Sequence, residues 1–154
     1  MNDKTVSRLF VGSQFAVLIA LVLIPGEENA WGEQTSLFKT IGLVLVLAGF
    51  AIEFVSARNL GRSLTASPIP REGSTFVATG IYKWVRHPIY TGLFVAGAGM
   101  VLQRGWMPHL ALEFSLIVLL TIKARWEEGF LLSRYPEYKS YMAKTGMFLP
   151  RLKG

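Results

Sequence analysis

Four stretches of apolar residues dominate the chain, and polar or charged segments separate them. They cover residues 9–24, 37–57, 89–103 and 106–122. A helix rises about 1.5 Å per residue, so about 20 residues are needed to cross a hydrocarbon core of about 30 Å. The second stretch meets this length and the fourth is just long enough, whereas the third is short enough to form half of a re-entrant hairpin. The pattern predicts an all-α, polytopic membrane protein with about four transmembrane helices in one domain.

Composition supports this prediction and excludes other classes. The 154 residues are 51% hydrophobic, with a mean hydropathy of +0.39, a net charge of +6 and no cysteine. A disordered tail would be far less hydrophobic, and a nucleic-acid-binding module would spread its basic residues over a soluble surface. The absence of cysteine excludes disulfides, thiolate metal sites and cysteine nucleophiles. The first stretch lacks a small-residue cleavage site after it, so we expect an uncleaved membrane helix.

Basic residues are unevenly distributed between the apolar stretches. They precede the first stretch, recur through residues 58–87 and follow the fourth stretch, while the other two connections are poor in lysine and arginine. The positive-inside rule therefore predicts that both termini and the long middle loop are cytoplasmic. We expect an integral protein of a bacterial-type inner (plasma) membrane, with its active site on the cytoplasmic side.

The long loop ends in a segment with unusual chemistry. Pro88 suits the first position of a helix and biases His87 away from helical geometry. The free N–H groups at the start of this helix would then lie beside Arg86 and attract an anion such as a carboxylate or phosphate.

The segment after the fourth stretch is the second unusual region. Glu127 and Glu128 continue the helix beyond the membrane, where anionic headgroups would repel them. Adjacent helical residues lie about 100° apart, so we expect one acid to face inward and the other to face water. A short helix between Pro136 and Gly146 is expected to be a cytoplasmic amphipathic helix lying on the membrane surface.

Together these segments resemble a known superfamily. Residues 80–92 contain Arg86-His87-Pro88-Ile-Tyr90-Thr-Gly92, similar to the Arg-His-Pro-x-Tyr-x-Gly signature of isoprenylcysteine carboxyl and phospholipid methyltransferases. Residues 127–131 resemble that superfamily's Glu-Glu-x-x-Leu motif, and residues 148–150 resemble its Phe-Leu-Pro ending. The resemblance covers about residues 75–152. One departure concerns the tail, because Pro136 stands where a glycine is common.

The resemblance implies methyl transfer from S-adenosylmethionine to a membrane lipid or lipid-linked acceptor, without a Rossmann fold and without nucleic acid. It assigns Arg86 and Glu128 to catalysis. The cofactor-binding residues that it implies are Tyr82, Val85, Arg86, His87, Pro88, Tyr90, Gly92, Glu127 and Glu128. Arg86 suits the cofactor's carboxylate, either glutamate suits its ammonium or ribose diol, and the rings of Tyr82, Trp84 and Tyr90 suit its sulfonium.

The acceptor is less clearly indicated. A carboxylate is ionised at neutral pH and needs no general base, whereas an ethanolamine headgroup must lose a proton to a base such as Glu128 or His87. Arg58, Arg62 and Arg125 would suit either a carboxylate or a phosphate. The short chain and its ending favour a carboxylate of isoprenylcysteine type over phospholipid N-methylation. No pattern indicates the oligomeric state.

Other features favour different classes of protein. Glu53 lies inside the second apolar stretch, where an acid is costly and a functional candidate, so a small proton-coupled exporter of cations is the alternative. A membrane reductase using NADPH and an inactive membrane subunit are further alternatives. His109 and Glu113 have the i, i+4 spacing of metal ligands, but two ligands without a third are more often a hydrogen-bonded pair.

Overall fold

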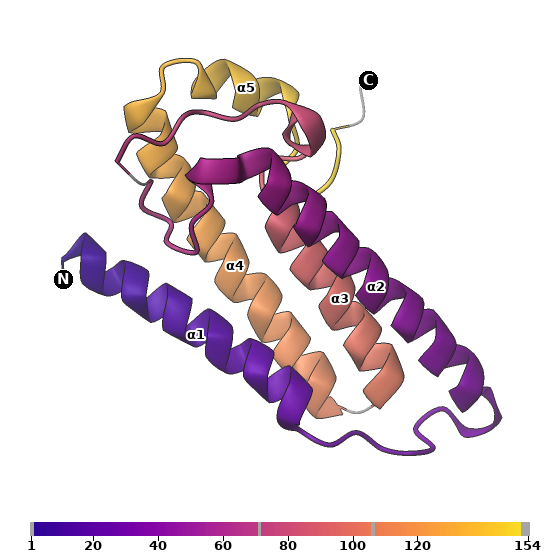
Figure 1. The fold of residues 1–154 in the computed structure, drawn as a ribbon. Helices are drawn as coiled ribbons and strands as arrows, with labels where there is room; N and C mark the ends of the chain where they lie inside the picture. Colours follow the sequence, from indigo (N-terminus) through magenta and orange to yellow (C-terminus); the bar gives the residue numbers. More distant parts are fainter. Residues whose placement is uncertain (1, 71, 106, 152–154) are drawn as a thin grey trace.

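The chain folds into four long helices capped at one end by irregular segments and a short helix (Figure 1). The computed structural model describes residues 2–70, 72–105 and 107–151. The long helices are α1 (Asp3–Leu23), α2 (Thr35–Leu60), α3 (Pro88–Arg104) and α4 (Met107–Arg134). The short helix is α5 (Tyr138–Lys144), and the 3₁₀ turns are η1 (Gly32–Gln34), η2 (Gly61–Ser63) and η3 (Gly80–Lys83). The all-α prediction is confirmed.

α2 and α3 begin and end within three residues of the predicted stretches, whereas α1 begins six residues before its stretch. Pro88 is the first residue of α3, as predicted from its fixed φ angle. α4 continues to Arg134, so the paired glutamates extend the membrane helix as expected. Trp106, at the predicted start of the fourth stretch, and residue 152, at the end of the predicted methyltransferase-like region, lie outside the described residues.

Three of the described helices, α1, α2 and α4, are long and apolar enough to cross a membrane. α3 has 17 residues and falls short of that length. Its C-terminal end nevertheless meets the α1–α2 connection, because Trp31 Nε1 donates to Leu102 O at 2.8 Å and Glu27 N donates to Arg104 O at 3.0 Å. α3 therefore runs between the same two ends as its neighbours and is not half of a re-entrant hairpin.

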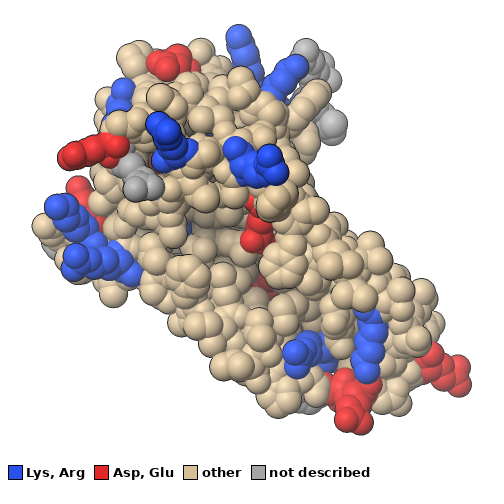
Figure 2. All heavy atoms as spheres, in the orientation of Figure 1, with Lys and Arg blue, Asp and Glu red and all other residues tan. Residues whose placement is uncertain are grey.

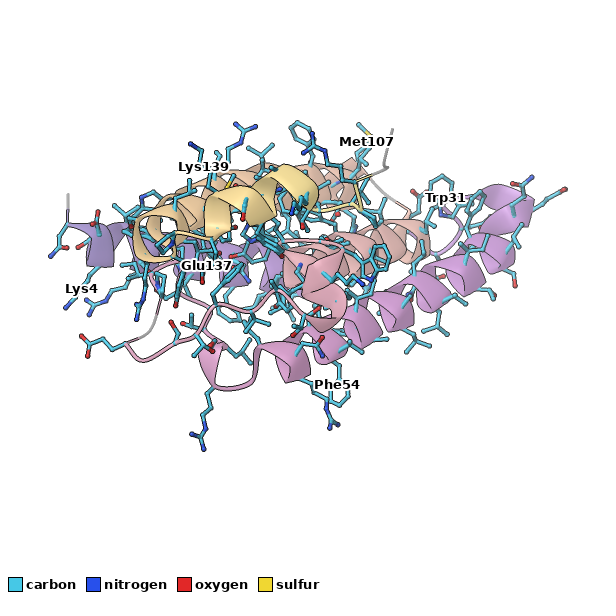
Figure 3. All side chains as sticks on the ribbon, turned by 90° about the horizontal axis from the view of Figure 1, so that it is seen from above. Lys4, Trp31, Phe54, Met107, Glu137 and Lys139 are labelled. Carbon is cyan, nitrogen blue, oxygen red and sulfur yellow. The ribbon has the colours of Figure 1, made fainter. Side chains whose placement is uncertain are left out.

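α3 lies between α2 and α4, and α1 packs on the other side of α4. Many large apolar side chains of α1, α2 and α4 are exposed on the outside, and Phe54 of α2 points away from the other helices (Figure 3). Such extended apolar surfaces are rare on soluble proteins and are typical of contact with lipid. Lys and Arg side chains gather at the capped end and near the start of α1, with a smaller charged group at the opposite end (Figure 2).

Glycines allow α2 and α3 to approach very closely. A Cβ atom on Gly49 would lie 2.6 Å from the carbonyl oxygen of Gly92 and 2.7 Å from Cβ of Ala96. Small residues at such an interface let two backbones pack together, as is common between membrane helices. This contact holds the start of α3, and therefore the first motif, against the C-terminal half of α2.

We expect Gly49→Ala to lower the free energy of unfolding by about 1–3 kcal/mol, because the new methyl group overpacks this interface. Denaturant unfolding of the protein in detergent micelles measures the change. Gly12→Ala is the matched control, because a Cβ atom there meets no heavy atom within 4 Å. The control should be neutral or gain about 0.5–1 kcal/mol of helix stability. Equal losses in the two variants would contradict the role of the α2–α3 contact.

Candidate functional site

The two sequence motifs meet at the capped end, which consists of residues 61–70, 72–87 and 135–151 and is called the cap below. The chain after α5 runs beside the segment that precedes α3, with a parallel bridge between Val85 and Gly146. Arg86 N donates to Gly146 O at 2.9 Å, and His87 N donates to Met147 O at 3.0 Å. The C-terminal segment thus holds the first motif in position through backbone hydrogen bonds.

Glu128 joins three elements with one carboxylate. Its Oε1 accepts a hydrogen bond from Arg86 Nε at 2.6 Å, lies 3.0 Å from His87 Nε2 and accepts from the Tyr138 hydroxyl at 3.4 Å. Arg86 also donates through Nη1 to the carbonyl oxygen of Thr145. Glu128 is only 4% exposed, so these contacts lie in a poorly solvated environment where charge-assisted bonds are strong. Glu128 therefore fixes the end of α4 against α5 and the start of α3.

Glu127 faces the neighbouring group of side chains. Its Oε2 accepts a hydrogen bond from the Tyr90 hydroxyl at 3.0 Å and lies 3.9 Å from His87 Nδ1. The His87 ring stacks on Tyr90 with centroids 5.4 Å apart and planes at 5°. Both acids therefore face inward, and the expectation that one would face water is wrong. The reason is that His87 lies between the two carboxylates and draws both toward the start of α3, although the Glu127 side chain remains 25% exposed.

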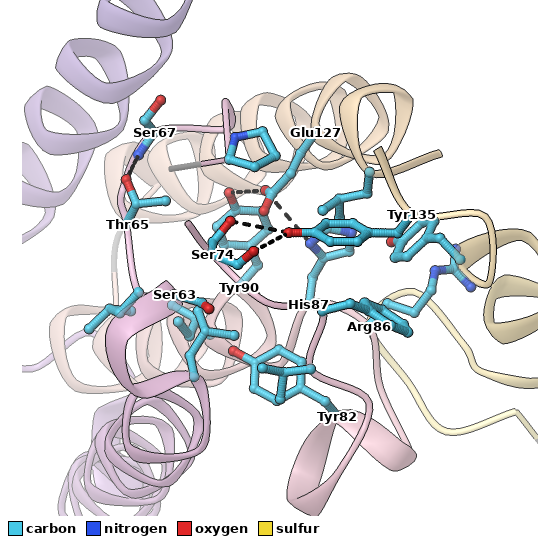
Figure 4. A pocket seen from close by; sticks show the side chains of 18 of the residues that line it. Ser63, Thr65, Ser67, Ser74, Tyr82, Arg86, His87, Tyr90, Glu127 and Tyr135 are labelled. Carbon is cyan, nitrogen blue, oxygen red and sulfur yellow. Dashed lines mark hydrogen bonds and ion pairs between the residues drawn. The ribbon is translucent and has the colours of Figure 1, made fainter. Parts of the chain in front are cut away.

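A cavity of about 380 Å³ lies beneath the cap, between these motif residues and the loop that follows α2 (Figure 4). This volume is within the range of about 300–1,000 Å³ typical of small-molecule sites. Ser63, Thr65 and Ser67 lie on one side of it, and Arg86, Tyr135 and Tyr82 lie on the other. Of the residues predicted for the site, those that line the cavity are Tyr82, Arg86, His87, Tyr90 and Glu127.

The remaining predicted residues lie nearby and do not line the cavity. Val85 and Pro88 are buried in the protein interior. Glu128 bonds with Arg86 and His87 on the side away from the cavity. Gly92 packs against Glu53 and Gly49 of α2. Trp84 is 60% exposed and has Lys83 over its ring. The structure therefore separates residues that face the cavity from residues that hold them.

The predicted anion-binding arginines also lie elsewhere. Arg58 packs over the exposed ring of Phe54, with 5.6 Å between its Cζ and the ring centroid. Arg62 and Arg125 are exposed and do not line the cavity. The cations among the cavity-lining residues are Arg86 and Lys123.

Sequence reasoning missed several of the cavity-lining residues. Lys123 and Gln14 come from α4 and α1, and the side chains of residues 63–67, 70 and 74–77 form a polar and apolar wall. That wall is held by Tyr135, whose hydroxyl donates to Ser74 O at 2.8 Å, and by the pair of Ser7 and Ser67 hydroxyls at 2.9 Å. The one available signal was Gln14, a polar residue inside an apolar stretch.

α5 covers the site, whereas it was expected to lie on the membrane surface. Tyr138 is 2% exposed, and Tyr141 donates through its hydroxyl to Tyr82 O at 2.5 Å. The ring of Phe76 packs edge-on against both tyrosines. The apolar face of this helix is therefore buried in protein, because the loop over residues 74–77 supplies a closer apolar partner than a bilayer.

Burial keeps Tyr82 and Tyr141 in their neutral form. Burial, reinforced by the charge of Glu127, raises the pKa of Tyr82 well above its usual value. Burial also raises the pKa of Tyr141, to about 12. These phenols are therefore hydrogen-bond donors and neutral aromatic surfaces at physiological pH, and they are not general bases.

The other singled-out acids and histidine lie outside the cavity. Glu53 faces Gly92 of α3, and its Oε1 is buried without a hydrogen-bond partner among the described residues. His109 is fully buried near the opposite end of α4, and Glu113 packs against Gly97. Among the described residues, no three His, Cys, Asp or Glu side chains come together as metal ligands.

Comparisons with known proteins agree with the family resemblance that the two motifs indicate. Residues 37–138 match the sequence model of the phospholipid methyltransferase family. The cobalt-zinc-cadmium resistance protein CzcN of Cupriavidus metallidurans is 37% identical over 98% of this chain and 67% of its own length. The protein-S-isoprenylcysteine O-methyltransferase of Saccharomyces cerevisiae is 30% identical over 88% of this chain and 60% of its own length.

A solved structure shares the fold. It is a eukaryotic intramembrane Ras methyltransferase, an isoprenylcysteine carboxyl methyltransferase, with a TM-score of 0.70 and 19% identity. The match covers all of this chain and 55% of that one. The fold, the two motifs and the family match lead to one conclusion: this chain belongs to the phospholipid methyltransferase family, within the superfamily that includes the isoprenylcysteine carboxyl methyltransferases.

Proposed function

We propose that this protein is an integral membrane methyltransferase that moves a methyl group from S-adenosylmethionine to a carboxylate of isoprenylcysteine type on a membrane-borne acceptor. The main support for the proposal is the cavity, because Glu127 of the second motif and His87 and Tyr90 of the first motif all line it. The membrane helices α1 and α4 contribute to the same lining through Gln14 and Lys123, so a lipid-linked molecule in the bilayer lies close to the cavity.

The donor set of the cavity fits S-adenosylmethionine. This cofactor carries an ammonium, a ribose diol and a sulfonium, together with a carboxylate. Glu127 supplies a carboxylate for the ammonium or the diol, and the rings of Tyr82 and Tyr90 supply neutral aromatic faces for the cation. When bound, the cofactor supplies an activated methyl carbon. Arg86 and the backbone at the start of α3 are the proposed partners of its carboxylate.

The chain's own residues then align the reactants and exclude water. Glu128 positions Arg86 and His87, and α5 covers the cavity through Tyr138 and Tyr141. An ionised carboxylate acceptor needs no base, so alignment and removal of water are the main contributions to rate. An ethanolamine acceptor would require a proton to move to His87 or a glutamate, which makes phospholipid N-methylation the second candidate.

We propose further that the cap lies in the cytoplasm and that the membrane is a bacterial-type inner (plasma) membrane. Basic side chains gather at the capped end and near the start of α1 (Figure 2). This distribution is the one that the positive-inside rule associates with the cytoplasmic side.

Isothermal titration calorimetry of the detergent-solubilised protein tests the cofactor. We expect saturable binding of S-adenosylmethionine and no binding of NADPH. Transfer of labelled methyl groups into prenylcysteines, ethanolamine lipids and total membrane extract then identifies the acceptor. Binding of NADPH alone would overturn the proposal in favour of a reductase. Proton-driven uptake of a cationic dye that is lost in Glu53→Gln would favour an exporter.

A further inference from the structure

Lys123 is a buried cation whose position the membrane topology does not explain. It is 1% exposed, whereas Arg125 on the same helix is exposed to the surroundings. Lysines that orient a membrane helix keep their ammonium group in the headgroup region or in water. Lys123 instead lines the cavity beneath the cap, together with Gln14 of α1.

The bonding of Lys123 is incomplete for a buried ammonium. Nζ donates to Gln14 Oε1 at 2.5 Å and lies 5.4 Å from the centre of the Tyr90 ring. An ammonium group has three N–H donors, and a buried charge is costly unless it is paired and hydrogen-bonded. Among the described residues, no carboxylate lies within 4.0 Å of Nζ, although Glu127 attracts it from farther away. The cavity therefore offers a positive charge without a bonded anion.

We propose that Lys123 and Gln14 form the subsite that binds the carboxylate of the methyl acceptor. The inference rests on the proposed function and adds to it the residues that select the acceptor. Lys123 precedes Glu127 by one helical turn, so the two Cβ atoms lie about 5–6 Å apart on one face of α4. An anion held by Lys123 is then adjacent to the part of the cavity where Glu127, Tyr82 and Tyr90 attract a cation.

The reaction at this subsite is balanced without a proton. One carboxylate oxygen accepts the hydrogen bond from Lys123, and the other forms the new C–O bond to the methyl carbon. The C–S bond breaks, its electron pair remains on sulfur, and the products are a neutral methyl ester and a neutral thioether. Lys123 stays protonated throughout, because no proton is released or consumed.

The subsite also predicts a selectivity between acceptor classes. A buried ammonium repels the ammonium of an ethanolamine headgroup, and like charges in a poorly solvated site repel strongly. It attracts the carboxylate substrate more than the uncharged ester product, which favours release of the product. Lys123 is therefore a specificity-determining residue.

Paired binding measurements test the subsite. The probes are N-acetyl-S-prenylcysteine, which has a carboxylate, and its carboxamide, which has the same shape without the charge. Wild-type protein should prefer the acid. In Lys123→Met we expect binding of the acid to weaken by about 10- to 100-fold, the range of a lost charge-assisted hydrogen bond, and the preference to disappear. Binding of the amide and of S-adenosylmethionine should stay within about twofold, because neither depends on this bond.

Three further variants separate binding from folding. Lys123→Arg keeps the charge and should keep part of the preference for the acid. Arg125→Met removes an exposed cation from the same helix and should change none of the binding constants. Thermal unfolding of Lys123→Met should be unchanged or improved, since an apolar residue of similar volume often replaces a buried charge without loss. Gln14→Leu should weaken binding of the acid more than binding of the amide, because Lys123 loses its hydrogen-bond partner.

The outcomes also separate this inference from the proposed function. An unchanged acid-to-amide ratio in Lys123→Met, with S-adenosylmethionine still bound, overturns the subsite alone. Weaker cofactor binding with an unchanged ratio overturns it as well, by assigning Lys123 to the cofactor. Failure of the wild-type protein to bind S-adenosylmethionine overturns the proposed function and with it the role of the subsite in methyl transfer; the acid-to-amide comparison then decides only whether Lys123 binds a carboxylate. Failure to bind the acid at all overturns the subsite.

Discussion

Replacing Glu128 by alanine is expected to abolish measurable binding of S-adenosylmethionine and to destabilise the cap. One carboxylate oxygen bonds with Arg86, His87 and Tyr138, so its removal leaves a buried guanidinium without its counter-ion. Breaking a buried ion pair in this way costs about 3–5 kcal/mol. The same loss frees Arg86 and His87, at the start of α3, from α4, and we expect cofactor affinity to fall at least about 100-fold. Calorimetry and thermal unfolding in detergent measure the two effects.

Two further variants keep this expectation testable if Glu128→Ala does not fold. Glu128→Gln retains an acceptor oxygen for Arg86 and Tyr138 without the charge, and should show a smaller loss of both stability and affinity. Glu137→Ala removes an exposed acid at the start of α5 and should leave both unchanged. Full cofactor affinity in Glu128→Ala would refute the positioning role of Glu128.

Replacing Glu127 by glutamine is expected to weaken S-adenosylmethionine binding while leaving stability nearly unchanged. Glu127 lines the cavity, and its proposed partner is the ammonium or the diol of the cofactor. Removing the charge from such a hydrogen bond weakens affinity by about 10- to 100-fold. The glutamine oxygen still accepts from the Tyr90 hydroxyl, so the free energy of unfolding should change by about 1 kcal/mol or less.

The matched control for this variant is Glu137→Gln, which makes the same chemical change at an exposed position. It should alter neither affinity nor stability. The contrast between the neighbouring glutamates is itself a test, because Glu128 should affect folding and binding together and Glu127 should affect binding alone. A large loss of stability in Glu127→Gln with unchanged affinity would assign Glu127 to the framework.

Much of the fold was predictable because membrane helices carry a strong signal. Apolar length and the proline at position 88 predicted the positions of the four long helices, although α1 begins six residues before the predicted stretch. The sequence could not show whether the third helix runs alongside the others or forms half of a re-entrant hairpin, since 17 residues are short for a membrane span. Its path depends on the contact of Gly92 with Gly49 of α2 and on the bonds from Trp31 and Glu27, all of which join distant parts of the chain.

The site was predictable where a motif concentrates chemistry in a short segment. His87, Tyr90 and Glu127 were predicted for the site and line the cavity. Lys123 had the sequence context of an orienting charge, because it directly follows an apolar stretch. Its burial depends on Gln14, which lies far away in the sequence, and local patterns carry no information about such a pairing.

The amino-acid sequence by itself determined the membrane class, the approximate helices, the charge asymmetry and the two motifs, because these depend on composition and on neighbours along the chain. Only the tertiary structure decided that both glutamates face inward, that α5 covers the site and that Lys123 lines the cavity. The physical reason is that burial and hydrogen bonding at the cap arise between segments separated by many residues. Arg86 lies near Glu128, and Gln14 near Lys123, only after the helices have packed.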